Sequence, residues 1–130
     1  MCAPGLHGHT LNAVAVDPRR AGRPYRFSYA KCVVGPRPTN SLNGVCRVDV
    51  VDGSVLTWHD SPSLLPAGPP TFVPRPGAAD ETDGIVLVDC LGADGRGVLV
   101  VLSGASFTEV ARVVVPYRHT YSYRDTWVPA

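Results

Sequence analysis

Short runs of apolar and β-branched residues alternate along this chain with segments rich in glycine and proline. Thirteen glycines and thirteen prolines divide the sequence, and almost no stretch repeats its apolar residues with the helical period. This pattern is typical of an all-β domain built from short antiparallel strands. It predicts strands in Pro24–Val34, Asp83–Leu91, Val98–Leu102 and Phe107–Val115, and a last strand in the alternating tail Tyr121–Val128.

Turn residues indicate how these strands connect. Gly44–Trp58 is interpreted as a β-hairpin, because Asp52 and Gly53 suit the positive φ angles of a tight turn. Two further turns and a proline-rich loop are predicted, in Gly92–Gly97, Ser103–Ser106 and His59–Thr71.

Two of the predicted strands carry more specific expectations. The strand Asp83–Leu91 is almost continuously apolar, so we expect it to be buried on both faces. Phe107–Val115 has an alternative interpretation as a short helix, because Ser106 and Glu109 have the spacing of a capping box. The β-branched residues that follow favour the strand.

The elements form consecutive antiparallel meanders, one in Gly44–Trp58 and another in Asp83–Val115. Successive sheets of this kind are typical of β-propeller blades, and a small β-sandwich is the alternative. A blade takes about 40–50 residues and a closed ring needs at least about four, so this chain has room for two to three blades. Blades at the ends would expose strand edges, and we expect self-association through them.

Composition narrows the classes of partner and compartment. The 130 residues suffice for one core, and a formal net charge of +1 without a basic patch argues against nucleic acid as a partner. No apolar run approaches the roughly 18 residues that cross a bilayer, and the first residues lack a signal-peptide pattern, so we expect a cytoplasmic protein. The four cysteines should then be free thiols, with Cys46 and Cys90 in the core.

Four segments carry a resemblance to a known family. They are GRPYRFSYA (Gly22–Ala30), VDVVDGSVLTW (Val48–Trp58), PTFVPRPGAADETDGIVL (Pro70–Leu87) and LVVLSGASFTEVARVVVPY (Leu99–Tyr117), in this order. The chain resembles the C-terminal region of the carotenoid cleavage oxygenases, in the branch of the animal β-carotene oxygenases and retinoid isomerases. The resemblance covers residues 22–130, whereas residues 1–21 form a poorly matched N-terminal segment.

This resemblance implies a seven-bladed β-propeller with a non-haem Fe(II) on its axis. In the family, four histidines hold the iron, and glutamates on the far ring nitrogens orient three of them. The iron uses O2 to cleave a double bond of a carotenoid or related apolar polyene into aldehydes. The polyene enters by an apolar tunnel that opens on a membrane-facing patch, so peripheral membrane contact is also implied.

The fourth iron histidine of the family corresponds to a position in VPYRHTYSYRDTW (Val115–Trp127). A gapless alignment on the family's Phe-His-Gly motif places Arg124 there. Arginine stays protonated and offers only donors, so it cannot bind a cation. His119 lies five residues earlier, on the opposite face of a strand, where we expect a partly exposed or hydrogen-bonded side chain. A ligand in a shifted register is the alternative for His119.

Glu81 is the residue that the resemblance connects with the iron site. The segment DETDG (Asp80–Gly84) matches the family's Glu-Glu-Asp-Asp-Gly motif, with Glu81 at the second acid, which orients an iron histidine in the family. An ordinary exposed turn acid is the alternative. The pair His7 and His9 is interpreted as a chance feature of a terminus, and His59 as a solvent-facing side chain.

The sequence therefore predicts a carotenoid cleavage dioxygenase-like protein. The regions that would carry the first three iron histidines have no counterpart here, and the fourth position is Arg124. We expect this chain to bind no Fe(II) alone and to be inactive alone. The alternative is a non-enzymatic module, derived from that family, that binds an apolar ligand or another protein.

Overall fold

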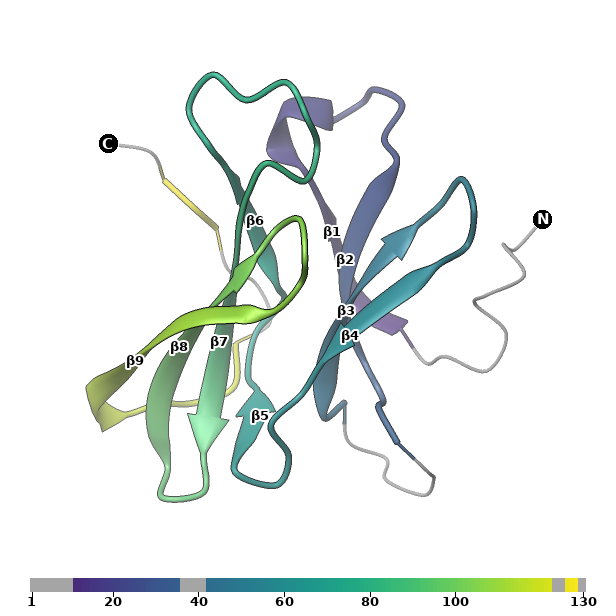
Figure 1. The fold of residues 1–130 in the computed structure, drawn as a ribbon. Helices are drawn as coiled ribbons and strands as arrows, with labels where there is room; N and C mark the ends of the chain where they lie inside the picture. The colour runs from purple at the N-terminus through teal and green to yellow at the C-terminus, as the bar shows by residue number, and fades with distance from the viewer. Residues whose placement is uncertain (1–10, 36–41, 123–125, 129–130) are drawn as a thin grey trace.

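The computed structural model describes residues 11–35, 42–122 and 126–128. Within these residues the chain forms two antiparallel sheets and one short 3-10 helix, η2 (Pro18–Arg20), with no α-helix. Figure 1 shows the two sheets as two neighbouring layers, with the N-terminal strands in one and the C-terminal strands in the other. The prediction of an all-β fold of antiparallel meanders is confirmed.

The first sheet has four strands in chain order. They are β1 (Leu11–Val16), β2 (Phe27–Cys32), β3 (Gly44–Asp49) and β4 (Val55–Trp58). The predicted hairpin is confirmed as β3 and β4, and Gly53 at its turn has a φ of 78°, which glycine adopts without strain. The expected positive φ at Asp52 was wrong, because the connection has five residues, 50–54, and is not a tight two-residue turn. β1 is an element that the sequence pattern did not predict.

The second sheet has five strands. They are β5 (Leu64–Pro66), β6 (Thr71–Pro74), β7 (Gly84–Gly92), β8 (Arg96–Ser103) and β9 (Glu109–Arg118). Leu65 lies opposite Leu91 and Phe72 lies opposite Val86, so β5 and β6 follow one another along the same edge of β7. The second sheet is therefore also a four-row meander whose first row is interrupted. The prediction of a loop throughout His59–Thr71 was wrong, because β5 forms within it.

One apolar core joins the two sheets. Tyr29 of β2 stacks on Phe72 of β6, with ring centroids 5.2 Å apart and planes 7° from parallel. The buried residues of the core between the sheets are Tyr29, Val45, Leu64, Phe72, Val86, Val88, Cys90, Val98, Val100, Leu102 and Phe107. A second cluster, formed by Ala30, Cys32, Cys46 and Val48, lies on the other face of the first sheet. The sheets thus pack face to face, as neighbouring propeller blades do.

Arginines fasten the two sheets together outside the core. Arg47 of β3 lies over the Phe27 ring, 4.8 Å from its centroid, and donates to the carbonyl of Ala105 at 2.8 Å. Arg112 of β9 donates to the carboxylate of Asp60, between β4 and β5, at 3.0 Å. These contacts link distant segments, so they fix how one sheet lies on the other.

The faces of β7 differ from the prediction. Val86, Val88 and Cys90 are fully buried, whereas Ile85 on the opposite face is 36% exposed. The expectation of burial on both faces was wrong, because the first sheet covers one face of the second, and the residues after β9 cover the other face only in part. A continuous apolar run shows that a strand is compatible with burial on both faces. It does not show that other elements cover both faces.

The strand interpretation of Phe107–Val115 is confirmed in β9, which begins at Glu109, and the helical alternative is wrong. Ser106 bonds the Thr108 hydroxyl at 2.7 Å rather than capping a helix. In the tail, Tyr121, Ser122 and Thr126–Val128 are not in a strand, so that prediction was wrong for the described residues.

The cysteine prediction is confirmed where the structure describes it. Cys32, Cys46 and Cys90 are free and buried, and Cys46 and Cys90 are core residues as expected. Cys2 lies outside the described residues.

Candidate functional site

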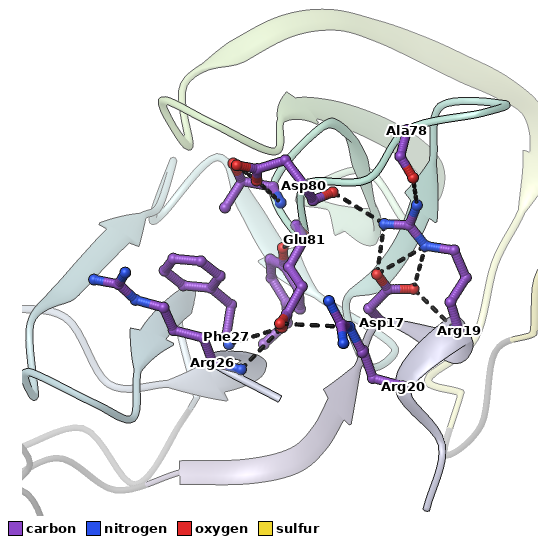
Figure 2. A network of polar contacts seen from close by, with 10 residues as sticks. Asp17, Arg19, Arg20, Arg26, Phe27, Ala78, Asp80 and Glu81 are labelled. Atoms are coloured by element: carbon purple, nitrogen blue, oxygen red, sulfur yellow. Dashed lines mark hydrogen bonds and ion pairs between the residues drawn. The ribbon is translucent and has the colours of Figure 1, made fainter. Parts of the chain in front are cut away.

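Glu81 lies in the loop between β6 and β7 and points toward the first sheet (Figure 2). Its Oε2 atom accepts backbone N–H bonds from Arg26 at 2.9 Å and from Phe27 at 3.4 Å. Its Oε1 atom lies 3.5 Å from Nε of Arg20, and its side chain is only 13% exposed. Glu81 is therefore not the exposed turn acid of the alternative interpretation. Its carboxylate satisfies the backbone at the start of β2.

Neighbouring residues hold the Glu81 loop in shape. The carboxylate of Asp80 accepts from the backbone N–H and the hydroxyl of Thr82, both at 2.7 Å, and these bonds lower the pKa of Asp80. Asp83 pairs with Arg75 at the other side of the loop, which lowers the pKa of Asp83. Acidic residues at these turn positions form local bonds, and Glu81 between them is left to reach inward.

An ion pair between a buried carboxylate and a partly exposed guanidinium reinforces the same junction. Asp17 caps η2 by accepting from the backbone of Arg19 at 2.9 Å, and its side chain is 1% exposed. The guanidinium of Arg19 bonds both carboxylate oxygens of Asp17 and donates to the carbonyl of Asp80 at 3.0 Å and to that of Ala78. Hydrogen bonding to Asp17 raises the pKa of Arg19. Figure 2 shows this pair beside Glu81, so two acids anchor η2 and β2 to one loop.

His119 follows the end of β9 and has a different partner. Its Nε2 atom bonds the carboxylate of Asp89 in β7, and its backbone N–H donates to the carbonyl of Gly95 at 3.0 Å. The histidine side chain is 35% exposed and that of Asp89 is 21% exposed. This arrangement agrees with a partly exposed, hydrogen-bonded histidine. His119 bonds Asp89 and Gly95, whereas the carboxylate of Glu81 faces Arg20, Arg26 and Phe27.

The remaining candidates fall outside a common site. Arg124, His7 and His9 lie outside the described residues, and His59 is exposed. Within residues 11–35, 42–122 and 126–128, no group of three or more His, Cys, Asp or Glu side chains is arranged to hold a metal ion.

Two adjoining apolar pockets lie along β6. The larger has a volume of about 290 Å³ and the smaller about 200 Å³. Four residues line both pockets: Pro69, Thr71, Thr126 and Trp127. The larger pocket also has Leu87, Leu99 and Val115 in its wall, with the carboxylate-bearing Asp89. The smaller reaches Ala15 and Val16 of β1, so it lies where the first strands of the two sheets meet.

Comparison with known proteins identifies the family. The family model described as "Retinal pigment epithelial membrane protein" matches residues 4–129. A carotenoid cleavage dioxygenase 8 homolog from Oryza sativa subsp. japonica is 37% identical over 127 residues, which is 98% of this chain and 22% of the relative. The chain belongs to the carotenoid cleavage oxygenase family.

Other members of the family agree in sequence and in structure. The β,β-carotene 15,15′-dioxygenase of Rattus norvegicus is 37% identical over 117 residues, covering 88% of this chain and 20% of the enzyme. The solved structure of a Synechocystis apocarotenoid oxygenase superposes with a TM-score of 0.85 at 28% identity, covering 92% of this chain and 26% of that one. The two sheets are thus blades of a carotenoid oxygenase β-propeller, and the chain spans about a fifth of the length of its curated relatives.

Carotenoid oxygenases are iron enzymes, and the described residues do not by themselves fit an Fe(II) site. Both oxygens of Glu81 already face N–H donors, and the Nε2 atom of His119 faces Asp89. No further imidazole joins them in the described part of the chain. We therefore derive no chemical step through iron from these residues.

Sequence reasoning missed the ion pair Asp17–Arg19 and the pocket residues Thr126 and Trp127. A signal for the first was present, since Asp17 precedes Pro18 in the pattern of a capped helical turn. The pockets had no local signal, because β1, β6 and the tail come together only through the packing of the two sheets.

Proposed function

We propose that this chain works as part of a carotenoid cleavage dioxygenase. The reaction is the oxidative cleavage, by Fe(II) and O2, of a double bond in a carotenoid or related apolar polyene to give aldehydes. The observation that carries the proposal is the match of almost the whole chain to carotenoid-cleaving relatives, at 37% identity. The two blades would supply part of the propeller wall, and the chain alone would have no turnover.

Glu81 is the residue through which these blades would reach the iron. In the wider propeller its carboxylate would orient an iron histidine that lies outside this chain. The backbone bonds from Arg26 and Phe27 support a held position for such a carboxylate, since an acid that orients a ligand must itself be fixed. A carboxylate accepts several bonds at once, so one further imidazole N–H is compatible with these contacts.

The proposed activity is tested on the longest reading frame that contains this sequence. We expect that frame to encode further spaced histidines, and its purified product to bind iron and release an apocarotenal from β-carotene under O2. The Glu81→Gln protein should retain iron less well and turn over more slowly, whereas Asp94→Asn, an exposed turn acid, should behave as wild type. A folded, iron-loaded product that cleaves no polyene would overturn the proposal.

A second candidate is a non-enzymatic module that binds an apolar ligand or another protein. Two observations favour it: the apolar pockets along β6, and the long edge strand β9, on which Val110, Val113, Val114 and Tyr117 are 57–70% exposed. Exposed apolar edges favour strand addition, so the chain would self-associate. Sedimentation across a concentration series tests this second candidate. An interaction module should form a defined oligomer, and Val113→Lys should dissociate it into monomers.

Location and membrane contact belong to the same proposal. No helix in the described part of the chain is long and apolar enough to cross a membrane. We propose a cytoplasmic location with peripheral membrane contact. An apolar polyene would enter the protein from the membrane at this contact. Co-flotation with liposomes, with and without β-carotene, tests that contact, and recovery of all protein in the liposome-free fractions would contradict it.

A further inference from the structure

Cys32 and Cys46 form a thiol pair on one face of two neighbouring strands. Cys32 lies opposite Gly44 and Cys46 lies opposite Ala30, so the two cysteines are diagonal neighbours in the β2–β3 ladder. Both side chains are fully buried in one small cluster. Both side chains point to the same face of the sheet, and interaction between the two thiols shifts the pKa of each.

The two sulfur atoms are not equivalent. The thiol of Cys32 donates to the sulfur of Cys46, and the backbone N–H of Ala30 donates to the same sulfur. These bonds lower the pKa of Cys46, whereas donation to Cys46, together with burial, raises the pKa of Cys32. At Cys90, by contrast, burial raises the pKa to about 12. These pKa directions favour Cys46, rather than Cys32, as the attacking sulfur.

We propose that Cys32 and Cys46 are a redox pair that hydrogen peroxide converts into a disulfide between β2 and β3. The Cys46 thiolate attacks a peroxide oxygen, the O–O bond breaks, and the departing hydroxide takes a proton to become water, leaving a sulfenic acid. The sulfur of Cys32 then attacks that of Cys46, the S–O bond breaks, and a second water leaves. Two thiols lose two hydrogens, and one hydrogen peroxide is reduced to two waters.

Access to the buried pair is through β1. This strand is at the edge of its sheet, and Leu11 in it lies opposite Cys32. Its pairing with β2 is interrupted between Asn12 and Ala15, and Ala13 between them has a strained φ of 53°. An irregular edge strand opens locally more readily than the core between the sheets. Opening of β1 therefore admits peroxide while the inter-sheet core stays closed.

The bridge would fasten the base of the connection between β2 and β3. Asn43 already ties this base, by accepting from the backbone N–H of Val34 at 2.8 Å and donating to its carbonyl at 2.9 Å. A disulfide one ladder step further in would add a covalent tie, reversible by a thiol reductant.

To test this, the purified full chain is treated with hydrogen peroxide and the remaining thiols are alkylated in denaturant. The peptides are then mapped by mass spectrometry. We expect the loss of two of the four alkylatable thiols, a linked peptide that joins Cys32 to Cys46, and full recovery of both thiols with dithiothreitol. The circular dichroism spectrum should stay unchanged. Retention of both thiols, or a bond from either cysteine to Cys2, would overturn the proposal.

Variants separate the roles of the two sulfurs. Cys32→Ala should leave a sulfenic acid at Cys46 that dimedone traps, whereas Cys46→Ala should leave Cys32 alkylatable after peroxide. Cys90→Ala is the matched control, because it also removes a buried thiol, and it should form the bridge as wild type does. The wild-type peptide map needs no variant, so it tests the disulfide between Cys32 and Cys46 even if an alanine variant fails to fold.

Discussion

The carboxylate of Glu81 accepts a hydrogen bond from the backbone N–H of Arg26 at 2.9 Å, across 55 positions of sequence. This bond joins the loop before β7 to the residue that precedes β2, and so joins one blade to the other. We propose that Glu81 orients an iron histidine in the wider propeller, and in this structure its carboxylate also ties the two sheets together. Paired measurements of stability and activity separate this structural role from the proposed positioning role.

Removal of the Glu81 carboxylate should destabilise the chain. Glu81→Ala leaves the N–H groups of Arg26 and Phe27 without an acceptor, and we expect a loss of about 1–3 kcal/mol in the free energy of unfolding. Glu81→Gln keeps an acceptor oxygen and should lose less. Urea denaturation followed by tryptophan fluorescence measures both. Asp94→Asn, at an exposed turn, should stay within about 0.5 kcal/mol of wild type. Equal losses for Glu81→Ala and Asp94→Asn would contradict this role.

The buried carboxylate of Asp17 should depend on its partner. Arg19→Ala leaves a carboxylate that is 1% exposed without its guanidinium. We expect a loss of about 2 kcal/mol, less than for a fully buried pair because Arg19 is 33% exposed. Arg75→Ala removes an exposed pair with Asp83 and should cause no measurable change in the same urea titration. A neutral Arg19→Ala variant would show that the pair does not support the junction.

Acid should weaken the contact between Glu109 and Arg112. Hydrogen bonds from Arg112 lower the pKa of Glu109 in the folded chain below its ordinary value of 4.5. The stabilisation is therefore present above pH 4.5 and is lost as the pH falls through the lower, folded pKa. We expect Glu109→Gln to destabilise the chain slightly at pH 7 and not at pH 3, in urea titrations at both values. An equal effect at the two pH values would contradict this assignment.

The shared core predicts that the two sheets unfold together. Phe72 is 2% exposed and stacks on Tyr29 from the other sheet, so Phe72→Ala should cost about 3–5 kcal/mol. Ile85→Ala, on the partly exposed face of β7, should cost clearly less. Calorimetry should show one transition for wild type. Two separate transitions would mean that the blades fold independently.

Local chemistry made part of this fold predictable. The β3–β4 hairpin was predicted because Asp52 and Gly53 are typical turn residues. β7, β8 and β9 were predicted because each contains a long, continuous run of β-branched and other apolar residues. β5 was missed, since Leu64 and Leu65 form a three-residue strand with Pro66 and gain stability only from pairing with β7. The partial exposure of the second face of β7 could not be predicted from its sequence either, because burial depends on which elements pack against a sheet.

The candidate site was predictable only in identity. The motif DETDG selected Glu81, but not its partners, because Arg26 and Phe27 meet it through the packing of the two sheets. Asp17 was missed although it is more buried than Glu81, since no motif connects it with Ala78 or Asp80.

We propose that this chain is a part of a carotenoid oxygenase propeller that has no turnover by itself. The most direct measurement loads the purified 130-residue chain with Fe(II) under anaerobic conditions, removes free metal, and then adds O2 and β-carotene. We predict less than stoichiometric iron and no apocarotenal by chromatography. Stoichiometric iron together with an apocarotenal product would contradict the claim.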